Sequence, residues 1–395
     1  MLTFFSLVAA TLCVSASDST VELTTFNAGV LAGVPLWRER MPFLLSELPN
    51  STADVLCLQE FWLETDQLAV VNATSDAFPY HVRLETHPSA TPPCDATPLQ
   101  AGLVCVQTRC PSNDSVDQIL CALLEENCRS ELRAMGQRCL NCLVLGSPNT
   151  GLLNDPLSCA VDTGVSYSTT NGLLLLSKIP LSNTVADGYN IATGEIDIYA
   201  RGYLSAEVEN LGTVVCTHLP TPNADRLDAP YFGPVEFNSI EEQQNAYIQQ
   251  LMNRYSSKSP LFLMGDFNHG PAIGDTVAAE FPQVYQNVLD QGFVSPAETR
   301  VGLCTSCLDN SLKSTGSANV FIDHVYVQSQ HASNVVDAKR LYEAVLPIGV
   351  PLSDHYGISV TYGIPVAEDP IEEWKTAFTA WKDAFREWQK NEEEC

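Results

Sequence analysis

Basic residues are scarce in this sequence. It has 20 Lys and Arg against 47 Asp and Glu, so its formal net charge at pH 7 is −27. Tight binding of a polyphosphate backbone needs clustered Lys and Arg, and the densest basic spot lies around Arg38 and Arg40. A nucleic-acid substrate is therefore disfavoured, although a bound cation would supply positive charge locally.

Long apolar runs are also missing. Beyond the first residues, no stretch reaches the roughly 18 apolar residues that a membrane-spanning helix needs. The N-terminus, MLTFFSLVAATLCVSAS, has a short apolar run followed by small residues. This pattern predicts a signal peptide over residues 1–16, with a buried N-terminal strand as the alternative. A signal peptide implies a secreted protein or one in the lumen of the secretory pathway, and sequons at Asn50, Asn72 and Asn113 fit glycosylation there.

Charge of either sign makes up little of the chain. Charged residues account for 17% of the sequence and hydrophobic residues for 45%, a composition that indicates a globular protein and not a disordered one. The length of 395 residues allows one large domain or two smaller ones. No internal repeat is evident.

Cysteine, by contrast, is abundant. Of the 14 cysteines, 14 − 1 = 13 remain if Cys13 leaves with the signal peptide. Eight of them crowd into one segment, and in a secreted chain such an even cluster predicts a disulfide framework whose pairing stays open. A zinc site at Cys139 and Cys142 is the alternative, but no second well-spaced pair lies nearby. The eight cysteines are Cys94, Cys105, Cys110, Cys121, Cys128, Cys139, Cys142 and Cys159.

Strand-like and helix-like stretches alternate along most of the chain. Several of the apolar runs are continuous, which is typical of strands covered on both faces. Helical patterns of apolar residues occupy residues 36–48 and 240–255. The alternation predicts a layered α/β protein with helices packed over sheets. The predicted strands are Val21–Phe26, Val55–Leu58, Leu173–Leu176, Thr213–Cys216, Leu261–Met264, Val320–Val327 and Gly357–Tyr362.

Two segments depart from this alternation. Residues 90–165 hold the cysteine cluster and a helical stretch near residues 116–145, and we predict that they form a disulfide-rich insertion in the main domain. Residues 366–395 carry aromatic and aliphatic side chains at spacings of 3 and 4, which predicts an amphipathic helix. This helix would dock on its own domain or on a second copy, or contact a membrane surface. Its acidic polar face argues against the membrane.

Polar residues follow the predicted strands where the strands end. Because carboxylates and imidazoles are costly to bury unpaired, one such strand end is unremarkable. Six of them predict that the side chains project to one rim, where the sheets gather them. The strand-end residues are Asn27, Gln59, Glu60, His218, Asp266, Asn268, His269, Asp323, His324, Ser353, Asp354 and His355.

This ordered set resembles the motifs of the endonuclease/exonuclease/phosphatase superfamily, whose members include deoxyribonuclease I, inositol-polyphosphate phosphatases and neutral sphingomyelinases. The resemblance covers about residues 20–363 and implies a catalytic domain over residues 17–365. It also implies a four-layer α/β sandwich, in which two sheets pack face to face with helices outside. The motifs that carry it are Asn27, Gln59-Glu60, Gly172–Lys178, Thr217-His218-Leu219, Gly265–Asn268, Asp323 and Ser353-Asp354-His355.

The resemblance implies a role for each of these residues in hydrolysis of a phosphate ester. Glu60 would be the principal ligand of a hard divalent cation, most suitably Mg²⁺ with Mn²⁺ and Ca²⁺ as alternatives, and Asn27 and Asp354 would lie near it. His355 would be the general base and Asp323 would hold its imidazole. The remaining residues would position the reactants: Asp266 the attacking water, and Asn268 and His218 the phosphoryl oxygens.

The substrate is less strongly indicated. The stretches around Asn171 and around Arg201-Gly202 look similar to those of neutral and bacterial sphingomyelinases, where a Lys-Gly pair commonly stands in place of Arg201-Gly202. They predict substrate contacts by Arg201 and Asn171. A zwitterionic head group also suits an acidic protein, so sphingomyelin or a related phospholipid is favoured. A secreted nuclease, a phosphoinositide phosphatase and an inactive binding module of the same fold follow in that order.

Overall fold

The computed structural model describes residues 19–31, 34–85, 92, 94–110, 121–122, 125–136, 139, 142–143, 159–160, 170–189, 200–221, 237–313, 318–364, 378–379, 381–382 and 386. The predicted signal peptide lies outside the described residues, and so does nearly all of the predicted C-terminal helix. Among the described residues, no helix combines the length and apolar character needed to span a bilayer. Val21–Tyr362 form one compact unit.

The described part of the chain forms two sheets of six strands each. In the first sheet the order is β11-β12-β1-β2-β4-β3, and in the second it is β5-β6-β7-β8-β10-β9. The strands of the first sheet are β1 (Thr20–Asn27), β2 (Val55–Gln59), β3 (Tyr80–Arg83), β4 (Leu174–Ser177), β11 (Val335–Leu341) and β12 (Gly357–Gly363). Those of the second are β5 (Leu181–Gly188), β6 (Gly202–Val208), β7 (Gly212–His218), β8 (Leu261–Asp266), β9 (Phe293–Val294) and β10 (Asp323–Gln328).

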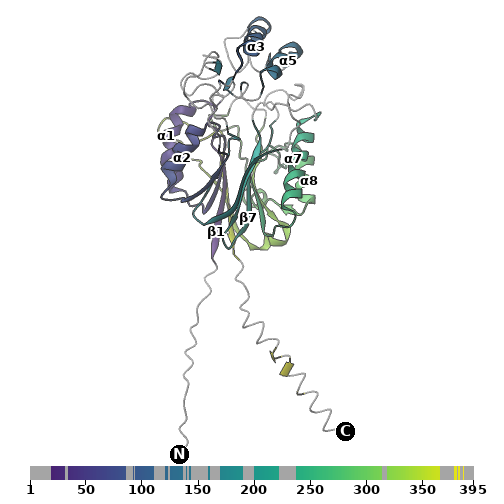
Figure 1. The fold of residues 1–395 in the computed structure, drawn as a ribbon. Helices are drawn as coiled ribbons and strands as arrows, with labels where there is room; N and C mark the ends of the chain where they lie inside the picture. Colours follow the sequence, from purple (N-terminus) through teal and green to yellow (C-terminus); the bar gives the residue numbers. More distant parts are fainter. Residues whose placement is uncertain are drawn as a thin grey trace, which may run out of the picture. The chain divides into compact units, whose positions relative to one another are not determined.

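Helices cover the outer faces of both sheets. Figure 1 shows α1 (Trp37–Glu47) and α2 (Glu64–Thr74) beside one sheet, and α7 (Ile240–Tyr255) and α8 (Pro282–Asp290) beside the other. The short α9 (Pro296–Val301) and the 3₁₀ helices η1 (Leu48–Asn50) and η3 (Ser329–Asn334) complete the connections. The predicted four-layer α/β sandwich is therefore confirmed.

The alternation of side chains along β2 shows why four layers form. Leu56 and Leu58 point outward and belong to the cluster under α1 and α2, together with Leu44 and Val70. Cys57, between them, points to the opposite face and forms a disulfide with Cys216 of β7. Both faces of the strand are buried, which explains its uninterrupted apolar run.

The strand directions bring the polar strand ends to one edge. β1 and β2 are parallel with Asn27 opposite Gln59, and β7 and β8 are parallel with His218 opposite Asp266. Strand β10 runs antiparallel to β8 and begins at the same edge, where Asp323 lies opposite Asp266. Parallel strands end together, so residues far apart in sequence meet at this edge.

The cysteine-rich segment leaves and rejoins the first sheet at the same edge. It connects Arg83 of β3 to Leu174 of β4, and these two residues pair with each other beside the end of β2. Its described helices are α3 (Ala96–Arg109) and α5 (Glu126–Ala134); α3 precedes the predicted helical stretch. All eight cysteines pair among themselves, which confirms the disulfide framework and shows that the zinc alternative is wrong. The pairs are Cys94–Cys139, Cys105–Cys128, Cys110–Cys121 and Cys142–Cys159.

Candidate active site

The candidate site lies between the two sheets at the edge just described. Each sheet supplies about half of the sequence-predicted residues, and hydrogen bonds from one sheet to the other join the halves. The first sheet and its loops carry Asn27, Glu60, Asn171, Asp354 and His355, and the second carries Arg201, His218, Asp266, Asn268 and Asp323.

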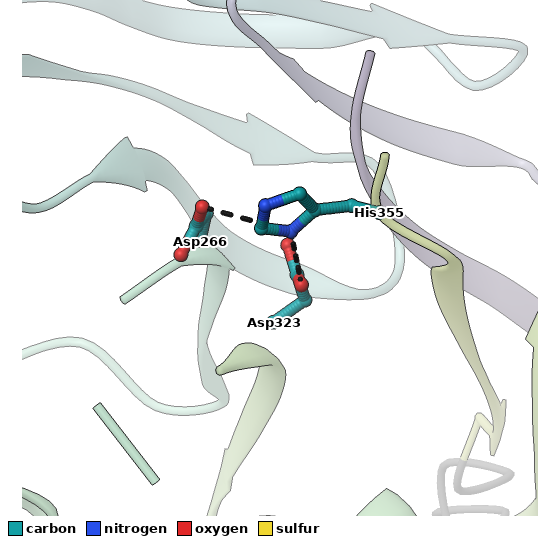
Figure 2. Close-up of side chains that lie close together, drawn as sticks. All are labelled: Asp266, Asp323 and His355. Atoms are coloured by element: carbon teal, nitrogen blue, oxygen red, sulfur yellow. Dashed lines mark hydrogen bonds and ion pairs between the residues drawn. The ribbon is translucent and has the colours of Figure 1, made fainter. Parts of the chain in front are cut away.

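His355 and Asp323 form a hydrogen-bonded pair across the sheets, as Figure 2 shows. His355 Nδ1 lies 2.9 Å from Asp323 Oδ2, and Asp323 is fully buried. Burial alone would lower the pKa of His355, but the carboxylates of Asp323, Asp266 and Asp354 raise this pKa well above its ordinary value. Because Nδ1 is engaged by Asp323, Nε2 is the nitrogen that can exchange a proton with a water molecule.

Asp266 connects several parts of the site. Its Oδ2 accepts a hydrogen bond from Asn27 Nδ2 at 3.0 Å and lies 3.4 Å from His218 Nε2. Its Oδ1 accepts from the backbone N–H of Asn268 at 2.9 Å. Burial, and then the charge of Asp323, raises the pKa of Asp266 to about 7. One ligand atom from each of Asp266, Asp323 and His355 falls within a span of 4.8 Å (Figure 2).

Glu60 and Asp354 form a second acidic group next to Asn27. Burial, and then the charge of Asp354, raises the pKa of Glu60 to about 8. Gly29 makes room for Asp354: it has φ +57°, and a Cβ at Gly29 would lie 2.3 Å from Asp354 Oδ1. The hydroxyl of Ser353 donates to the backbone oxygen of Asn27 at 2.7 Å, which ties the two loops together.

These oxygen-rich side chains fit a hard divalent cation. Glu60, Asp354 and the amide oxygen of Asn27 are ligands of the kind that Mg²⁺ prefers. Burial, and then the charge of Asp354, makes ionisation of Glu60 costly, and a cation beside it would offset this cost. The glycine cradle at Gly29 admits a carboxylate where a side chain would exclude it. A cation held here would neutralise the carboxylates and polarise a phosphoryl oxygen.

His218 and Asn268 lie on the other side of Asp266. Burial, reinforced by the charges of Arg201 and His355, lowers the pKa of His218 well below its ordinary value, so its ring is neutral. Among the described residues, His218 Nδ1 has no hydrogen-bond partner. The side-chain amide of Asn268 donates a hydrogen bond to the carbonyl of Leu219 at 3.0 Å. Gln244 of α7 holds both loops by donating to the carbonyls of Pro220 and Asn268.

Arg201 and Asn171 approach each other around Gly202. A Cβ at Gly202 would lie 2.9 Å from Asn171 Nδ2 and 2.4 Å from a backbone oxygen, so the Arg-Gly pair needs its glycine. The guanidinium of Arg201 lies over the ring of Trp62, 5.4 Å from its centroid. Asn171 is buried, and Nδ2 of its side chain has no hydrogen-bond partner among the described residues. The sequence-predicted substrate residues are thus brought to one place, beside His218.

Three residues of the site belong to none of the sequence motifs described above. Thr305 is fully buried, and its hydroxyl accepts hydrogen bonds from the backbone N–H groups of Ile322 and Asp323. Trp62 packs against Arg201. Arg40, part of the dense basic spot in the sequence, is fully buried and not on the surface. All three act through backbone or ring contacts between distant segments, and such contacts leave no motif.

His269 and His324, predicted at the same rim as the other strand-end residues, belong to a buried network behind the site. His269 contacts Gln244 and Tyr326, and His324 Nδ1 lies 2.9 Å from the hydroxyl of Ser295. Burial lowers the pKa of both rings, that of His324 to about 4. They are structural histidines that support the strands carrying Asp266 and Asp323.

Comparisons with known proteins agree with this architecture. Residues 24–355 match the Endonuclease/Exonuclease/phosphatase family. A search of curated proteins finds no match. Among solved structures, a 3′ phosphatase, NExo, from Neisseria, bound to product DNA hairpin, is 15% identical with a TM-score of 0.51, covering 87% of this chain and 99% of that one. The 3′-5′ exonuclease (NExo) from Neisseria meningitidis is 14% identical with a TM-score of 0.50, covering 87% and 100%.

The sphingomyelinase C from Streptomyces griseocarneus is 13% identical with a TM-score of 0.48, covering 87% of this chain and 100% of that one. At such low identities the two Neisseria structures show a shared fold alone. The family match is of a different kind, because it runs from β1 to the histidine that pairs with Asp323. The chain belongs to the Endonuclease/Exonuclease/phosphatase family.

Proposed function

We propose that this protein is a divalent-cation-dependent phosphodiesterase that uses water as its nucleophile. One observation supports this most: the buried pair His355–Asp323 lies next to Asp266, while Glu60 and Asp354 form an acidic group beside it. A histidine held by one carboxylate and flanked by others is suited to removing a proton from water. The adjacent oxygen ligands suit a cation that binds a phosphate oxygen.

Each side chain then has a separate task in the proposed reaction. Asp323 fixes the ring of His355, and Nε2 of this ring, in its deprotonated form, takes the proton of the attacking water. Asp266 orients that water, and it is held in turn by Asn27. The side-chain amide of Asn268 and the ring of His218 would face the phosphoryl group, with Asn268 as a hydrogen-bond donor. Glu60, Asp354 and Asn27 would hold the cation, with Mg²⁺ preferred over Mn²⁺ and Ca²⁺.

For the substrate we propose sphingomyelin or a related phospholipid. The net charge of −27 disfavours long polyanions, whereas a phosphocholine head group is zwitterionic. Arg201 provides one cationic group beside the phosphoryl side of the site, and Asn171 Nδ2 provides a buried donor. A single diester phosphate can use one such cation, whereas a nucleic acid would need several. A nuclease of the deoxyribonuclease I type is the alternative.

We also propose that the protein is secreted and glycosylated. Six disulfides join cysteines of the described part of the chain, four of them in the cysteine-rich segment, and such bonds persist in oxidising compartments. Asn50 and Asn72 are exposed, as carriers of glycans must be. The third sequon, at Asn113, lies outside the described residues.

A substrate panel tests the proposed function. Purified protein is incubated with sphingomyelin vesicles, double-stranded DNA or inositol phosphates, each with Mg²⁺ and with chelator. We expect cleavage of sphingomyelin that needs Mg²⁺. Preferential cleavage of DNA would favour the nuclease alternative over the lipid substrate. No cleavage of any of these substrates with Mg²⁺ would refute the proposal that the protein is an enzyme.

Substitution of the base tests the proposed mechanism. His355→Ala should lower kcat/KM by about 100- to 10,000-fold, the usual contribution of a general base. His331→Ala is the matched control: it is a histidine after the far end of β10, where its ring contacts Ser259. Equal activity of the His355 variant and the parent would contradict the assignment.

A further inference from the structure

Arg40 is a buried arginine directly behind the proposed cation ligands. It lies on α1 and is fully buried. Its guanidinium donates four hydrogen bonds whose acceptors are all backbone oxygens. Nη1 reaches the oxygens of Ala28 at 3.0 Å and Leu352 at 2.6 Å, Nη2 that of Gly29 at 2.5 Å, and Nε that of Pro35 at 3.3 Å.

These bonds join the two loops that carry cation ligands. Ala28 and Gly29 directly follow Asn27, and Leu352 precedes Asp354 by two residues. The loops come from distant parts of the chain, since Arg40 and Leu352 are 312 positions apart. The planar guanidinium presents its donors in a rigid fork, so one side chain sets the spacing of both loops at once. Gly29 meanwhile lets the Asp354 carboxylate pack against the first loop.

The charge of Arg40 also matters to the cluster. Carbonyl oxygens satisfy its donors but do not neutralise a buried cation, which is costly to hold alone. Burial lowers the pKa of Arg40, and the carboxylates of Asp354 and Glu60 counteract this effect. The guanidinium of Arg40 and the acidic cluster therefore stabilise each other. The same guanidinium holds the backbone around the proposed cation ligands.

We propose that Arg40 is a positioning residue that organises the cation site before the cation binds. Arg40 fixes the backbone next to Asn27 and near Asp354, at Ala28, Gly29 and Leu352, and so holds the two ligand loops together. The inference rests on the proposed cation site but concerns a residue that touches neither cation nor substrate. A buried arginine that served folding alone would affect stability and leave cation affinity unchanged.

Cation affinity of the full-length protein tests this directly. Mg²⁺ and Mn²⁺ binding are measured by isothermal titration calorimetry for the parent, Arg40→Lys and Arg40→Gln, with thermal melting recorded for each. Arg40→Lys keeps the charge but loses the fork, so we expect it to weaken cation binding on the order of 10- to 100-fold, as loss of a ligand-orienting group commonly does. Arg40→Gln loses both charge and fork and should bind more weakly still.

Arg300→Lys is the matched control. Arg300 also donates to two backbone oxygens, those of Val335 and Val336, but on the outer strand β11. The Arg300→Lys variant should leave cation affinity unchanged, whether or not its melting temperature changes. The Mg²⁺ concentration that gives half-maximal hydrolysis should rise for Arg40→Lys in parallel with the dissociation constant, and saturating Mg²⁺ should restore most of kcat.

Two results would overturn the inference, and they are distinguishable from each other. If the parent binds cations and folded Arg40→Lys binds them equally well, Arg40 is not a positioning residue and the proposed function stands. If the parent binds no divalent cation, the proposed function fails and the inference fails with it. Should Arg40→Gln not fold, Arg40→Lys alone decides, because it retains the buried charge.

Discussion

At the scale of single residues, the site contains backbone conformations that cost free energy. Glu60 has φ 66° and Asn268 has φ 51°, both in the left-handed region that side chains other than glycine rarely adopt. Glu60 also carries a carboxylate whose pKa is raised to about 8 by burial and by Asp354. Strain and buried like charge in one residue indicate a position kept for function and not for stability.

Replacing Glu60 by Gln should therefore stabilise the cation-free protein and abolish activity. The pKa of Glu60 in the folded state, about 8, exceeds the ordinary value of 4.5. The protonated carboxyl of Glu60 therefore contributes its full stabilisation below pH 4.5, and this contribution is lost as the pH rises through 8. In chelator, Glu60→Gln should exceed the parent in free energy of unfolding by a margin that grows from pH 5 to pH 8. We expect the margin at pH 8 to be more than about 1 kcal/mol, the equivalent of one pKa unit.

Urea denaturation at several pH values measures this margin. Glu241→Gln, at an exposed position of α7, controls for the loss of one negative charge. A margin that does not change with pH would mean that burial does not suppress ionisation of Glu60.

At the scale of elements, the disulfide between β2 and β7 joins the two halves of the site. Cys57 lies three residues before Glu60, and Cys216 lies two residues before His218. The bond crosses the interface between the sheets, close to where Asn27 and Asp266 meet. It closes a sequence separation of 159 residues, the longest of the six disulfides, so it removes the most entropy from the unfolded chain.

The double variant Cys57→Ala, Cys216→Ala should lower the free energy of unfolding by about 3–5 kcal/mol, because chain entropy alone gives about 5 kcal/mol for a loop of this length. The double variant Cys110→Ala, Cys121→Ala closes a separation of only 11 residues and should cost less, about 3 kcal/mol or below. Guanidinium denaturation followed by the fluorescence of the buried Trp62 reports both. Equal losses would show that loop length does not determine the effect.

The same scale explains which elements could be predicted from the sequence. The predicted strands β1, β2, β4, β7, β8, β10 and β12 lie inside the sheets, where both faces are covered and apolar runs result. Strands β3, β5, β9 and β11 were not predicted, and these four are the sheet edges. In β5 most residues are exposed or partly exposed, so no apolar pattern exists to be found. Strand β6 is internal but is not among the predicted strands, although the Arg201-Gly202 motif lies at its start.

The candidate site was predictable to a similar extent. Polar residues at strand ends indicated one rim, and the structure brings Asn27, Asp266, Asp323 and His355 together there. Their roles stay predictions. Arg40 could not be recognised, because its partners are backbone oxygens 5 to 312 positions away and any residue supplies such an oxygen. A basic residue in a short basic stretch is expected to be exposed, and only the fold shows that other segments bury it.

At the scale of the whole molecule, negative charge dominates. With a net charge of −27, the chain repels other anionic bodies over distances set by the Debye length, about 10 Å at 0.1 M salt. Two of its arginines, Arg40 and Arg201, are buried near the site and contribute little to the outer field. Approach to a substrate surface should therefore depend on the charge of that surface.

Sphingomyelin vesicles with and without phosphatidylserine test this dependence at constant Mg²⁺. At low salt, anionic lipid should slow hydrolysis, because the acidic protein is repelled before it reaches the bilayer. Raising the NaCl concentration should restore the rate on anionic vesicles, since repulsion is screened, and should change little on zwitterionic ones. Detergent-dispersed sphingomyelin, which presents no charged surface, should show neither effect. Faster hydrolysis of anionic vesicles at low salt would instead require a local basic surface that outweighs the net charge, and it would favour an anionic substrate over the zwitterionic one.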